Sequence, residues 1–372
     1  MPPQVTGFSD MSERSSQHTL PNVARGEENS DILNSSVPSV SEEKAKQIAA
    51  DCFGIQGTAL NLTSERDANF RLTTDAGVSY ALKFANPAEP PEITNFQTEA
   101  LRHLQRKDPQ LPVPKVVPTR DGRLELTLTL ADGRRSVVRL LTWVEGEQVF
   151  RGGVSSALRR DIGTMLARLG KGLSDFDHPG ASHEIQWDIK NASKLRPMTG
   201  AIEAAGIRAM VEAELDHFDT CVAPQLTTLR QQVIHNDLNH YNVVVAPGSS
   251  DRVGGILDFG DMVKTATVID AAVAASYMTS LEDSALDCVA DFVGAYNAVH
   301  RLTRKEVEML RDLIVARLVT SICITQWRAS RYPENAAYIL RNNGPARRGM
   351  ERFAALPRAT VTHHLLNVCK LE

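Results

Sequence analysis

The stretch from Val233 to Asp261, VIHNDLNHYNVVVAPGSSDRVGGILDFGD, limits most strongly what this chain can fold into. It contains two short β-like segments joined by a turn rich in Pro, Gly and Ser. His235, Asp237 and Asn242 stand at or before the first segment, and Asp258 follows the second. Carboxylates and an amide at strand ends can hold a hard cation and take a proton from a hydroxyl. The stretch therefore predicts a catalytic and metal-binding loop pair.

The spacing within this stretch suggests separate roles for its polar residues. Mg²⁺ takes few protein ligands, typically one or two carboxylates or amides, and completes its shell with water and phosphate oxygens. Asn242, five residues after Asp237, and Asp258, which lies between apolar residues, fit that requirement. Asp237 is then free to accept a hydroxyl proton, and we expect it to be the catalytic base. We expect His235 to brace the loop through hydrogen bonds.

The first half of the chain supplies a lysine and a glutamate that belong with this site. Segments at 58–63, 68–74 and 79–85 have strand character, and a turn signal containing Gly joins the last two into a hairpin. Lys83 points to a face of the third segment that otherwise carries small residues. An exposed lysine on a sheet edge is the alternative interpretation. Glu99, sixteen residues later in a predicted helix, could hold Lys83 by an ion pair.

The chain divides into a leader and two regions of different pattern. Residues 1–38 are rich in Ser, Asn, Glu and Gly without apolar periodicity, and we expect them to be a disordered leader. Residues 39–146 have the pattern of an antiparallel sheet with one long inserted helix, at about 92–107. Residues 147–372 are mainly helical in pattern. The expected fold is therefore α+β, with a nucleotide-binding N-lobe and a helical C-lobe for catalysis and acceptor binding.

Composition and charge argue against several classes of protein. A net charge of −4 gives no basic face for nucleic acid. The five cysteines are scattered and form no C-x-x-C, so they read as apolar thiols and not as a disulfide or zinc framework. The N-terminus has no apolar core of a signal peptide, and no run approaches the roughly 18 apolar residues of a spanning helix. We expect a cytoplasmic protein without membrane or nucleic-acid partners; oligomeric state has no signature here.

The polar residues follow the order of the protein-kinase signature. That signature places a Lys at the end of a strand, a pairing Glu in the next helix, an Asp and an Asn in H-R-D-L-x-x-x-N, and an Asp in D-F-G. Here the corresponding positions are Lys83 in YALK, Glu99, Asp237 and Asn242 in HNDLNHYN, and Asp258 in LDFGD. Because all of them occur in order and in the expected context, chance is a poor explanation.

Departures from the protein-kinase pattern are informative as well. SERDANF replaces the glycine-rich loop, so phosphate contacts would come from its backbone amides and from Ser64 or Asn69. His-Asn-Asp replaces His-Arg-Asp, and no A-P-E motif follows Asp258. A helical pattern already begins near Thr267, which leaves no room for an activation segment. These differences favour a constitutively active kinase of a small molecule.

The chain resembles the aminoglycoside phosphotransferase and choline kinase-like family, which has a protein-kinase-like bilobal fold. Within it, the resemblance is closest to hydroxylysine kinases and to kinase-like domains fused to class III aminotransferases. It extends over residues 41–345 and is carried by SERDANF, YALKFAN, TEALRHL, LPVPKVVP, VRLLTWVEG, EIQWDIKNASKLRP, QQVIHNDLNHYNVVV, GILDFGDMVKTATVIDAA and ARLVTSICITQWRASRYPEN. The resemblance implies Mg²⁺-dependent transfer of a γ-phosphoryl group from ATP or GTP to a hydroxyl of a small amine-bearing metabolite.

The resemblance also implies roles for individual residues. Lys83 would contact the α- and β-phosphates, and Glu99 would position it. Asp237 would be the catalytic base, and Asn242 and Asp258 would bind Mg²⁺. A hinge between the lobes would offer backbone groups to the nucleotide base, from Leu141, Thr142, Trp143 and Val144.

The sequence gives weaker indications of which residues bind the acceptor. A cationic amine favours carboxylates, and Asp261, directly after Asp-Phe-Gly, is the best-placed candidate. For the other candidates a surface or core role competes with substrate binding; they are Asp177, Glu184, Trp187, Asp188 and Trp327. The first choice of acceptor is 5-hydroxy-L-lysine. Homoserine, choline or ethanolamine, an aminoglycoside, and a non-catalytic nucleotide-binding regulatory module remain alternatives.

Overall fold

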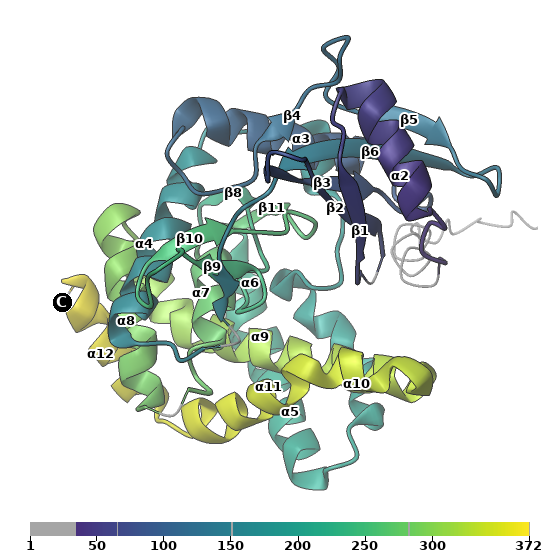
Figure 1. Ribbon diagram of the computed structural model, residues 1–372. Coiled ribbons are helices and arrows are strands. Elements are labelled where there is room, and N and C mark those ends of the chain that lie inside the picture. Colours follow the sequence, from purple (N-terminus) through teal and green to yellow (C-terminus); the bar gives the residue numbers. More distant parts are fainter. Residues whose placement is uncertain (1–34, 65, 150–151, 282, 372) are drawn as a thin grey trace, which may run out of the picture.

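The computed structural model describes residues 35–64, 66–149, 152–281 and 283–371. They form an N-lobe built on a sheet and a larger, helical C-lobe (Figure 1). Most of the predicted leader lies outside the described residues. The predicted α+β bilobal architecture is confirmed.

The N-lobe sheet runs in the order β1-β2-β3-β6-β4, with β5 paired to β6, and all its pairs are antiparallel. Its strands are β1 (Thr58–Leu62), β2 (Ala68–Thr73), β3 (Ser79–Phe84), β4 (Val116–Val117), β5 (Leu126–Thr129) and β6 (Arg135–Thr142). In β2 every second residue is buried, as the two-residue period of a strand requires. Phe70 of β2 and Phe84 of β3 pack edge to face on the buried side, with ring centroids 5.8 Å apart.

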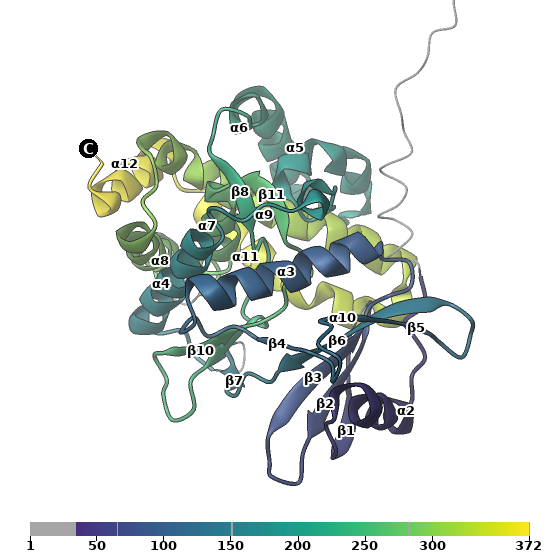
Figure 2. The same ribbon diagram turned by 90° about the horizontal axis from the view of Figure 1, so that it is seen from above.

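Two helices accompany the sheet. The first, α2 (Glu42–Ile48), begins where the Ser41 hydroxyl accepts a hydrogen bond from the backbone N–H of Lys44. The second, α3 (Pro91–Lys107), is the predicted long helix and buries the apolar stripe that includes Phe96 and Leu104. Figure 2 shows α3 lying between the sheet and the C-lobe helices. It therefore ties the two lobes together.

Two small antiparallel sheets in the C-lobe hold the predicted loop pair. One joins β8 (Gln231–Ile234) to β11 (Val263–Ala266), and the other contains β7 (Glu147–Gln148), β9 (Val243–Val245) and β10 (Val253–Ile256). The loop from β8 to β9 carries Asp237, and the loop from β10 to β11 carries Asp258. Since the paired strands fix both ends of each loop, the two acidic residues are brought to one place.

Helices make up the rest of the C-lobe. They are α4 (Ser156–Gly172), α5 (Ala205–His217), α6 (Ala223–Leu226), α7 (Val268–Ser276), α8 (Ala285–Val299), α9 (Arg304–Arg331), α10 (Ala336–Ile339), α11 (Asn343–Gly349) and α12 (Arg358–Cys369). A Cβ at Gly163 of α4 would come within 2.3 Å of the Phe292 carbonyl oxygen, so this glycine permits the close approach of α4 to α8. The long helix α9 is buried along most of its length.

One helix begins later than its pattern predicted. Residues 199–220 have a weak helical pattern in the sequence, whereas α5 begins only at Ala205. Residues Ile189–Ala201 instead form 3₁₀ turns around Pro197, which cannot donate a backbone hydrogen bond and so disfavours a regular α-helix. Among the described residues, no helix is long and apolar enough to cross a membrane, and all the cysteines are free thiols.

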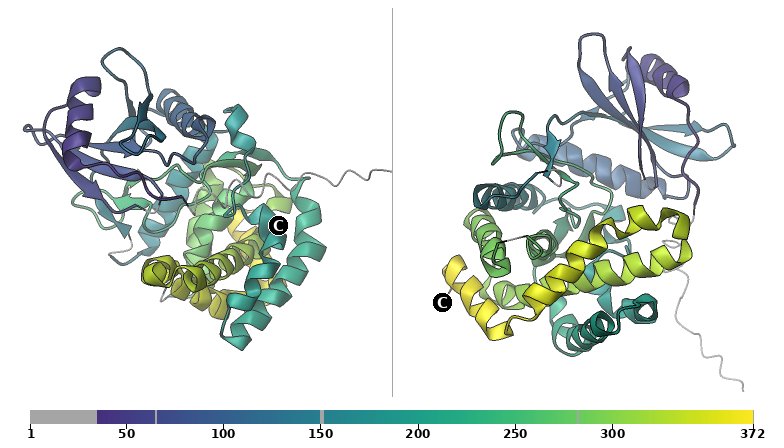
Figure 3. Two further views of the ribbon diagram at one scale, coloured as in Figure 1. Left: turned by 90° about the vertical axis from the view of Figure 1, so that its right-hand side faces the viewer. Right: turned by 60° about the horizontal axis from the view of Figure 1, so that its bottom comes forward.

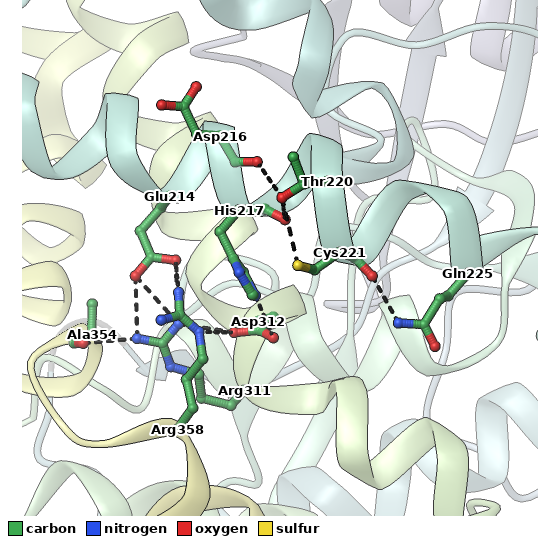
Figure 4. Close-up of polar contacts among 10 residues, drawn as sticks. All are labelled: Glu214, Asp216, His217, Thr220, Cys221, Gln225, Arg311, Asp312, Ala354 and Arg358. Atoms are coloured by element: carbon green, nitrogen blue, oxygen red, sulfur yellow. Dashed lines mark hydrogen bonds and ion pairs between the residues drawn. The ribbon is translucent and has the colours of Figure 1, made fainter.

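A buried ion network ties α5, α9 and α12 together (Figure 4). Arg311 of α9 is 2% exposed and forms ion pairs with Glu214 and Asp312, and it also donates a hydrogen bond to the Ala354 carbonyl. Arg358 of α12 contacts the same two carboxylates, at 2.7 and 3.0 Å. Since each carboxylate meets two guanidinium groups, removing one arginine leaves buried charge only partly compensated.

Replacing Arg311 by alanine is expected to lower the free energy of unfolding by about 3–5 kcal/mol, the usual cost of breaking a buried ion network. Urea denaturation followed by circular dichroism measures it. The matched control is Arg123→Ala, which breaks the exposed pair with Asp121 and should have a much smaller effect. Equal effects of the two variants would show that the network contributes little.

Candidate active site

A cleft of about 220 Å³ lies between the lobes and brings together predicted site residues from both of them. From the N-lobe, Ser64, Asn69 and Lys83 line it. From the C-lobe, the lining includes Trp187, Asp237, Asp258 and Asp261. Residues separated by more than 150 positions in the chain thus share one cavity.

Asp237 is held by three donors. The Arg317 guanidinium contacts its Oδ1 at 2.8 Å, and the side-chain amides of Asn239 and Asn242 donate to its Oδ2, each at 2.9 Å. Burial raises the pKa of Asp237 to about 7, although the positive charge of Arg317 acts in the opposite direction. The carboxylate therefore has a fixed orientation and a proton affinity suited to a base working near neutral pH.

Asn242 and Asp258 have the donor chemistry of a magnesium site. Since the amide nitrogen of Asn242 is engaged with Asp237, its Oδ1 remains as the acceptor. Burial opposes ionisation of Asp258, but the positive charges of Lys83 and Arg66 hold its pKa below the usual value. Within the described parts of the chain, no cluster of three or more His, Cys, Asp or Glu side chains could hold a metal. One ionised carboxylate and one amide oxygen suit a cation that keeps water and phosphate ligands.

His235 connects the two loops. It is fully buried, and its Nδ1 accepts a hydrogen bond from the backbone N–H of Asp237 at 3.3 Å. The proton must then sit on Nε2, which donates to the Leu257 carbonyl at 3.0 Å. Burial lowers the pKa of the imidazole, so the ring stays neutral. These contacts are structural, and they fix the position of Asp237 relative to the Asp258 loop.

Several residues of the site carried no clear signal in the sequence. Asp270 of α7 accepts the backbone N–H of Asn236 at 2.9 Å, which supports the left-handed backbone of that residue (φ 65°). Arg317 could have been found, because a lone arginine in a long apolar run needs a buried partner. Arg66, inside SERDANF, was overlooked because the motif was read for its backbone amides.

Arg66 connects the lobes through Asp261. It lies in the loop between β1 and β2, and its guanidinium contacts the Asp261 carboxylate at 3.2 Å. Burial disfavours its charge, but Asp261, Glu89, Asp67 and Asp258 raise the pKa of Arg66 above its ordinary value. A permanently charged guanidinium thus faces the cleft next to Lys83, where an anion would be bound.

The predicted pairing of Glu99 with Lys83 is wrong. Glu99 is 30% exposed and forms an ion pair with Arg102, one turn further along α3, at 3.0 Å. The α3 residue that lines the cleft is Gln97. Side chains two positions apart on a helix point in directions that differ by about 200°. Because Gln97 faces the cleft, Glu99 faces away from it. The carboxylate that shares the cleft with Lys83 near the start of α3 is Glu89.

The predicted hinge comprises the end of β6 and the start of the connection to β7, and it does not line the cleft. Leu141 pairs with Ala81 of β3 and Val116 of β4 inside the sheet. The backbone N–H of Trp143 donates to the Ser79 carbonyl at 3.3 Å. The residues lining the cleft do not include 141–144. Their contact with a nucleotide base stays a prediction.

The predicted acceptor residues separate into two groups. Asp261 and Trp187 line the cleft. Asp188 does not, because it is buried as the N-cap of the 189–201 segment and forms an ion pair with Lys190 at 2.9 Å. Trp327 lies under the Arg331 guanidinium, 4.0 Å from the ring centroid, and is not among the lining residues. Neither residue therefore faces this cleft, and their contact with a substrate stays a prediction.

The two remaining acidic candidates lie at the surface. Asp177 forms an ion pair with Lys264 at 2.8 Å and is 74% exposed. Glu184 forms an ion pair with Lys194. Neither lines the cleft.

Comparison with known proteins gives relatives of one type. Hydroxylysine kinase of Mus musculus is 27% identical over 329 residues, covering 82% of this chain and 87% of the relative. Homoserine kinase of Methylobacillus flagellatus is 27% identical over 266 residues, covering 69% and 74%. Both are named kinases of small hydroxyl-bearing molecules.

Solved structures show the same fold. An amicoumacin kinase in complex with AMP-PNP, Ca²⁺ and Ami has a TM-score of 0.65 at 14% identity, covering 87% of this chain and 97% of that one. A microcompartment-associated aminopropanol kinase has a TM-score of 0.56 at 17% identity, covering 88% and 98%.

The family model described as "Phosphotransferase enzyme family" matches residues 58–304. This range includes the N-lobe sheet, α3, both small C-lobe sheets and every cleft-lining residue named above, but not Arg317, which contacts Asp237. The chain therefore belongs to the phosphotransferase enzyme family, and it is a small-molecule kinase.

Proposed function

We propose that this enzyme transfers the γ-phosphoryl group of GTP or ATP to the hydroxyl of a small amine-bearing metabolite, with 5-hydroxy-L-lysine as the first choice. The observation that carries the proposal is Asp237, a buried carboxylate held by three donors in the same cleft as Lys83 and Asp258. The choice of acceptor rests on relatives named hydroxylysine kinase from several vertebrates, at 24–27% identity.

The proposed mechanism divides the cleft by charge. Lys83 and Arg66, on the N-lobe side, would bind the nucleotide phosphates and neutralise their charge as the bond to the leaving oxygen lengthens. Asn242 Oδ1 and Asp258 would hold Mg²⁺, which, when bound, supplies further charge neutralisation at phosphate oxygens. Asp237 would orient the acceptor hydroxyl and take its proton. Arg317 and the two asparagine amides keep that carboxylate in place.

Binding of the nucleotide would also release Asp261. In the structure its carboxylate is paired with Arg66. A phosphate competes strongly for a guanidinium, because paired N–H groups match its oxygens. Asp261 would then be able to receive the amine of the acceptor.

An acceptor panel tests the proposal. Purified protein is incubated with Mg²⁺, either ATP or GTP, and hydroxylysine, homoserine, choline, ethanolamine or an aminoglycoside. Phosphorylated product is then detected by mass spectrometry. The expected result is acceptor-dependent consumption of one nucleotide with hydroxylysine. Binding of Mg·nucleotide in a thermal-shift assay without turnover of any acceptor would favour a regulatory nucleotide-binding module.

Homoserine is the second candidate acceptor. It is favoured by the homoserine kinase relative, although that match covers less of this chain than the hydroxylysine kinase matches do. Relative kcat/KM for the two amino acids decides between them.

The rate should depend on pH through Asp237. Its pKa is raised to about 7, and only the ionised carboxylate can accept the hydroxyl proton. We therefore expect kcat/KM for the acceptor to fall about tenfold per pH unit below pH 7 and to level off above it. Steady-state rates at saturating nucleotide, with nucleotide affinity measured at each pH as the control, give the profile. A flat profile from pH 5.5 to 8 would contradict the assignment of the base.

A further inference from the structure

Two arginines stand at the C-lobe end of the cleft, and the proposed mechanism gives them no role. Arg328 of α9 and Arg341, which follows α10, line the same cavity as Asp237 and Asp261. Arg328 is only 7% exposed. The Arg341 guanidinium lies over the Tyr338 ring at 3.8 Å from its centroid and 5.2 Å from that of Tyr241. Figure 3 shows α9 and the segment from α10 to α11 as a helical hairpin at the edge of the C-lobe.

The spacing along α9 places these arginines at a distance from the proposed base. Arg317 and Arg328 are eleven residues apart, which is about three helical turns, so both project from one face of α9. The corresponding separation along the helix axis is about 16 Å. Arg317 marks the end of the cleft where the acceptor hydroxyl would lie, because it contacts Asp237. Arg328 lies farther along the same face of α9 and also lines the cleft.

Arg341 differs from Arg66 and Arg317 in its partners. Arg317 is paired with Asp237, and Arg66 with Asp261. Across the described ranges of the chain, the ion pairs do not include one to Arg341. Stacking on tyrosine holds its guanidinium flat without neutralising it. A planar guanidinium held in this way matches the two oxygens of a carboxylate.

The aromatic residues of the region do not form a cage for an ammonium group. Trp187, which lines the cleft, lies under Arg317 at 5.2 Å, and Trp327 lies under Arg331 at 4.0 Å. One face of each ring is therefore already covered by a cation of the protein. For an acceptor amine the cleft offers Asp261, and beside it the two arginines offer positive charge.

From these placements we infer that the acceptor carries a carboxylate as well as an amine, and that Arg341 and Arg328 bind this carboxylate. The substrate class is therefore hydroxylated α-amino acids and not amino alcohols or sugars. This inference rests on the proposed function, since it concerns the acceptor of the same reaction.

Two matched pairs of acceptors test the inference. Hydroxylysine is compared with its decarboxylated analogue 1,5-diaminopentan-2-ol, and homoserine with 3-aminopropan-1-ol. Within each pair the hydroxyl and an amine are kept, and only the carboxylate is lost. Wild-type enzyme should prefer the amino acid of the better pair by about 10- to 100-fold in kcat/KM, the worth of hydrogen bonds to a charged group.

Arg341→Gln is the decisive variant, because Arg341 is only partly buried and its loss should not disturb folding. The KM for the amino acid should rise about 10- to 100-fold, while the KM for its decarboxylated analogue stays within twofold. Arg331→Gln is the matched control, since Arg331 stacks on Trp327 outside the cleft. It should leave both constants unchanged.

Binding is measured in parallel by calorimetry, with a non-hydrolysable nucleotide present. This distinguishes a failure of the carboxylate-binding site from a failure of the proposed kinase reaction. Equal turnover of both members of a pair would overturn the inference and leave the kinase proposal standing. Carboxylate-dependent binding that Arg341→Gln abolishes, without any turnover, would support the inference and overturn the proposed reaction. Absence of both binding and turnover for all four compounds would overturn both.

Discussion

Replacing Asp237 by asparagine is expected to lower kcat by about 10²- to 10⁴-fold, the usual contribution of a positioned base. Asparagine keeps the shape of the side chain but cannot accept the hydroxyl proton. Its amide also brings a donor into a site where Arg317, Asn239 and Asn242 all donate. Affinity for Mg·nucleotide should stay within about threefold, because the phosphate-facing cations are intact. Single-turnover rates and nucleotide titrations measure the two quantities.

Asp177→Asn is the control for this experiment. Asp177 is exposed, pairs with Lys264 and is absent from the cleft lining, so its loss should leave kcat unchanged. Thermal unfolding of both variants separates a chemical effect from a loss of structure. If Asp237→Asn abolished nucleotide binding but kept its stability, Asp237 would be a ligand-binding residue and not the base.

Replacing Asp258 by asparagine is also expected to lower kcat, by about 10³-fold, but for a different physical reason. Asp258 has a left-handed backbone, with φ at 56°, a conformation that asparagine adopts more readily than most residues. The hydrogen bond from the Gly260 N–H to Oδ1 can also be kept. The substitution therefore removes the negative charge while conserving the loop. If the proposed magnesium role holds, the concentration of Mg²⁺ for half-maximal rate should rise at least tenfold.

Magnesium titrations of the wild type and of Asp258→Asn, with rate and thermal shift as parallel readouts, test this role. Asp67→Asn is a useful comparison, because Asp67 lines the same cleft and contributes its charge near Arg66 but has no proposed contact with metal. An unchanged Mg²⁺ requirement in Asp258→Asn would remove that residue from the metal site.

Local pattern was sufficient for much of the fold. The strands at 58–62, 68–73 and 79–84 follow from alternation and a glycine turn, and α3 from its apolar stripe. These features depend on neighbours within a few residues, so a single sequence contains the information. The 199–220 segment was predicted less well, because a proline upstream and packing against α9 decide where α5 begins.

In the candidate site, too, local sequence spacing identified some residues, whereas packing decided the place of others. Asp237, Asn242 and Asp258 occupy two short loops whose spacing makes them recognisable. The structure places Asp237 and Asp258 in one cleft and bonds Asn242 to Asp237. Glu99 was misassigned because sequence position gives a residue's helix but not the face that packs toward the sheet. Gln97 and Glu99 exchange roles with a rotation of about half a turn.

The sequence by itself thus determined the chemistry of the loops and the family of the enzyme, since motif order and spacing are properties of the chain. Only the tertiary structure decided the partners. It brought Arg317 to Asp237 and Arg66 to Asp261, placed Arg341 in the cleft, and covered Trp187 and Trp327 with arginine. The physical reason is that a buried charge is stabilised by whichever opposite charge the fold brings within a few ångströms, and these partners lie far away in the sequence.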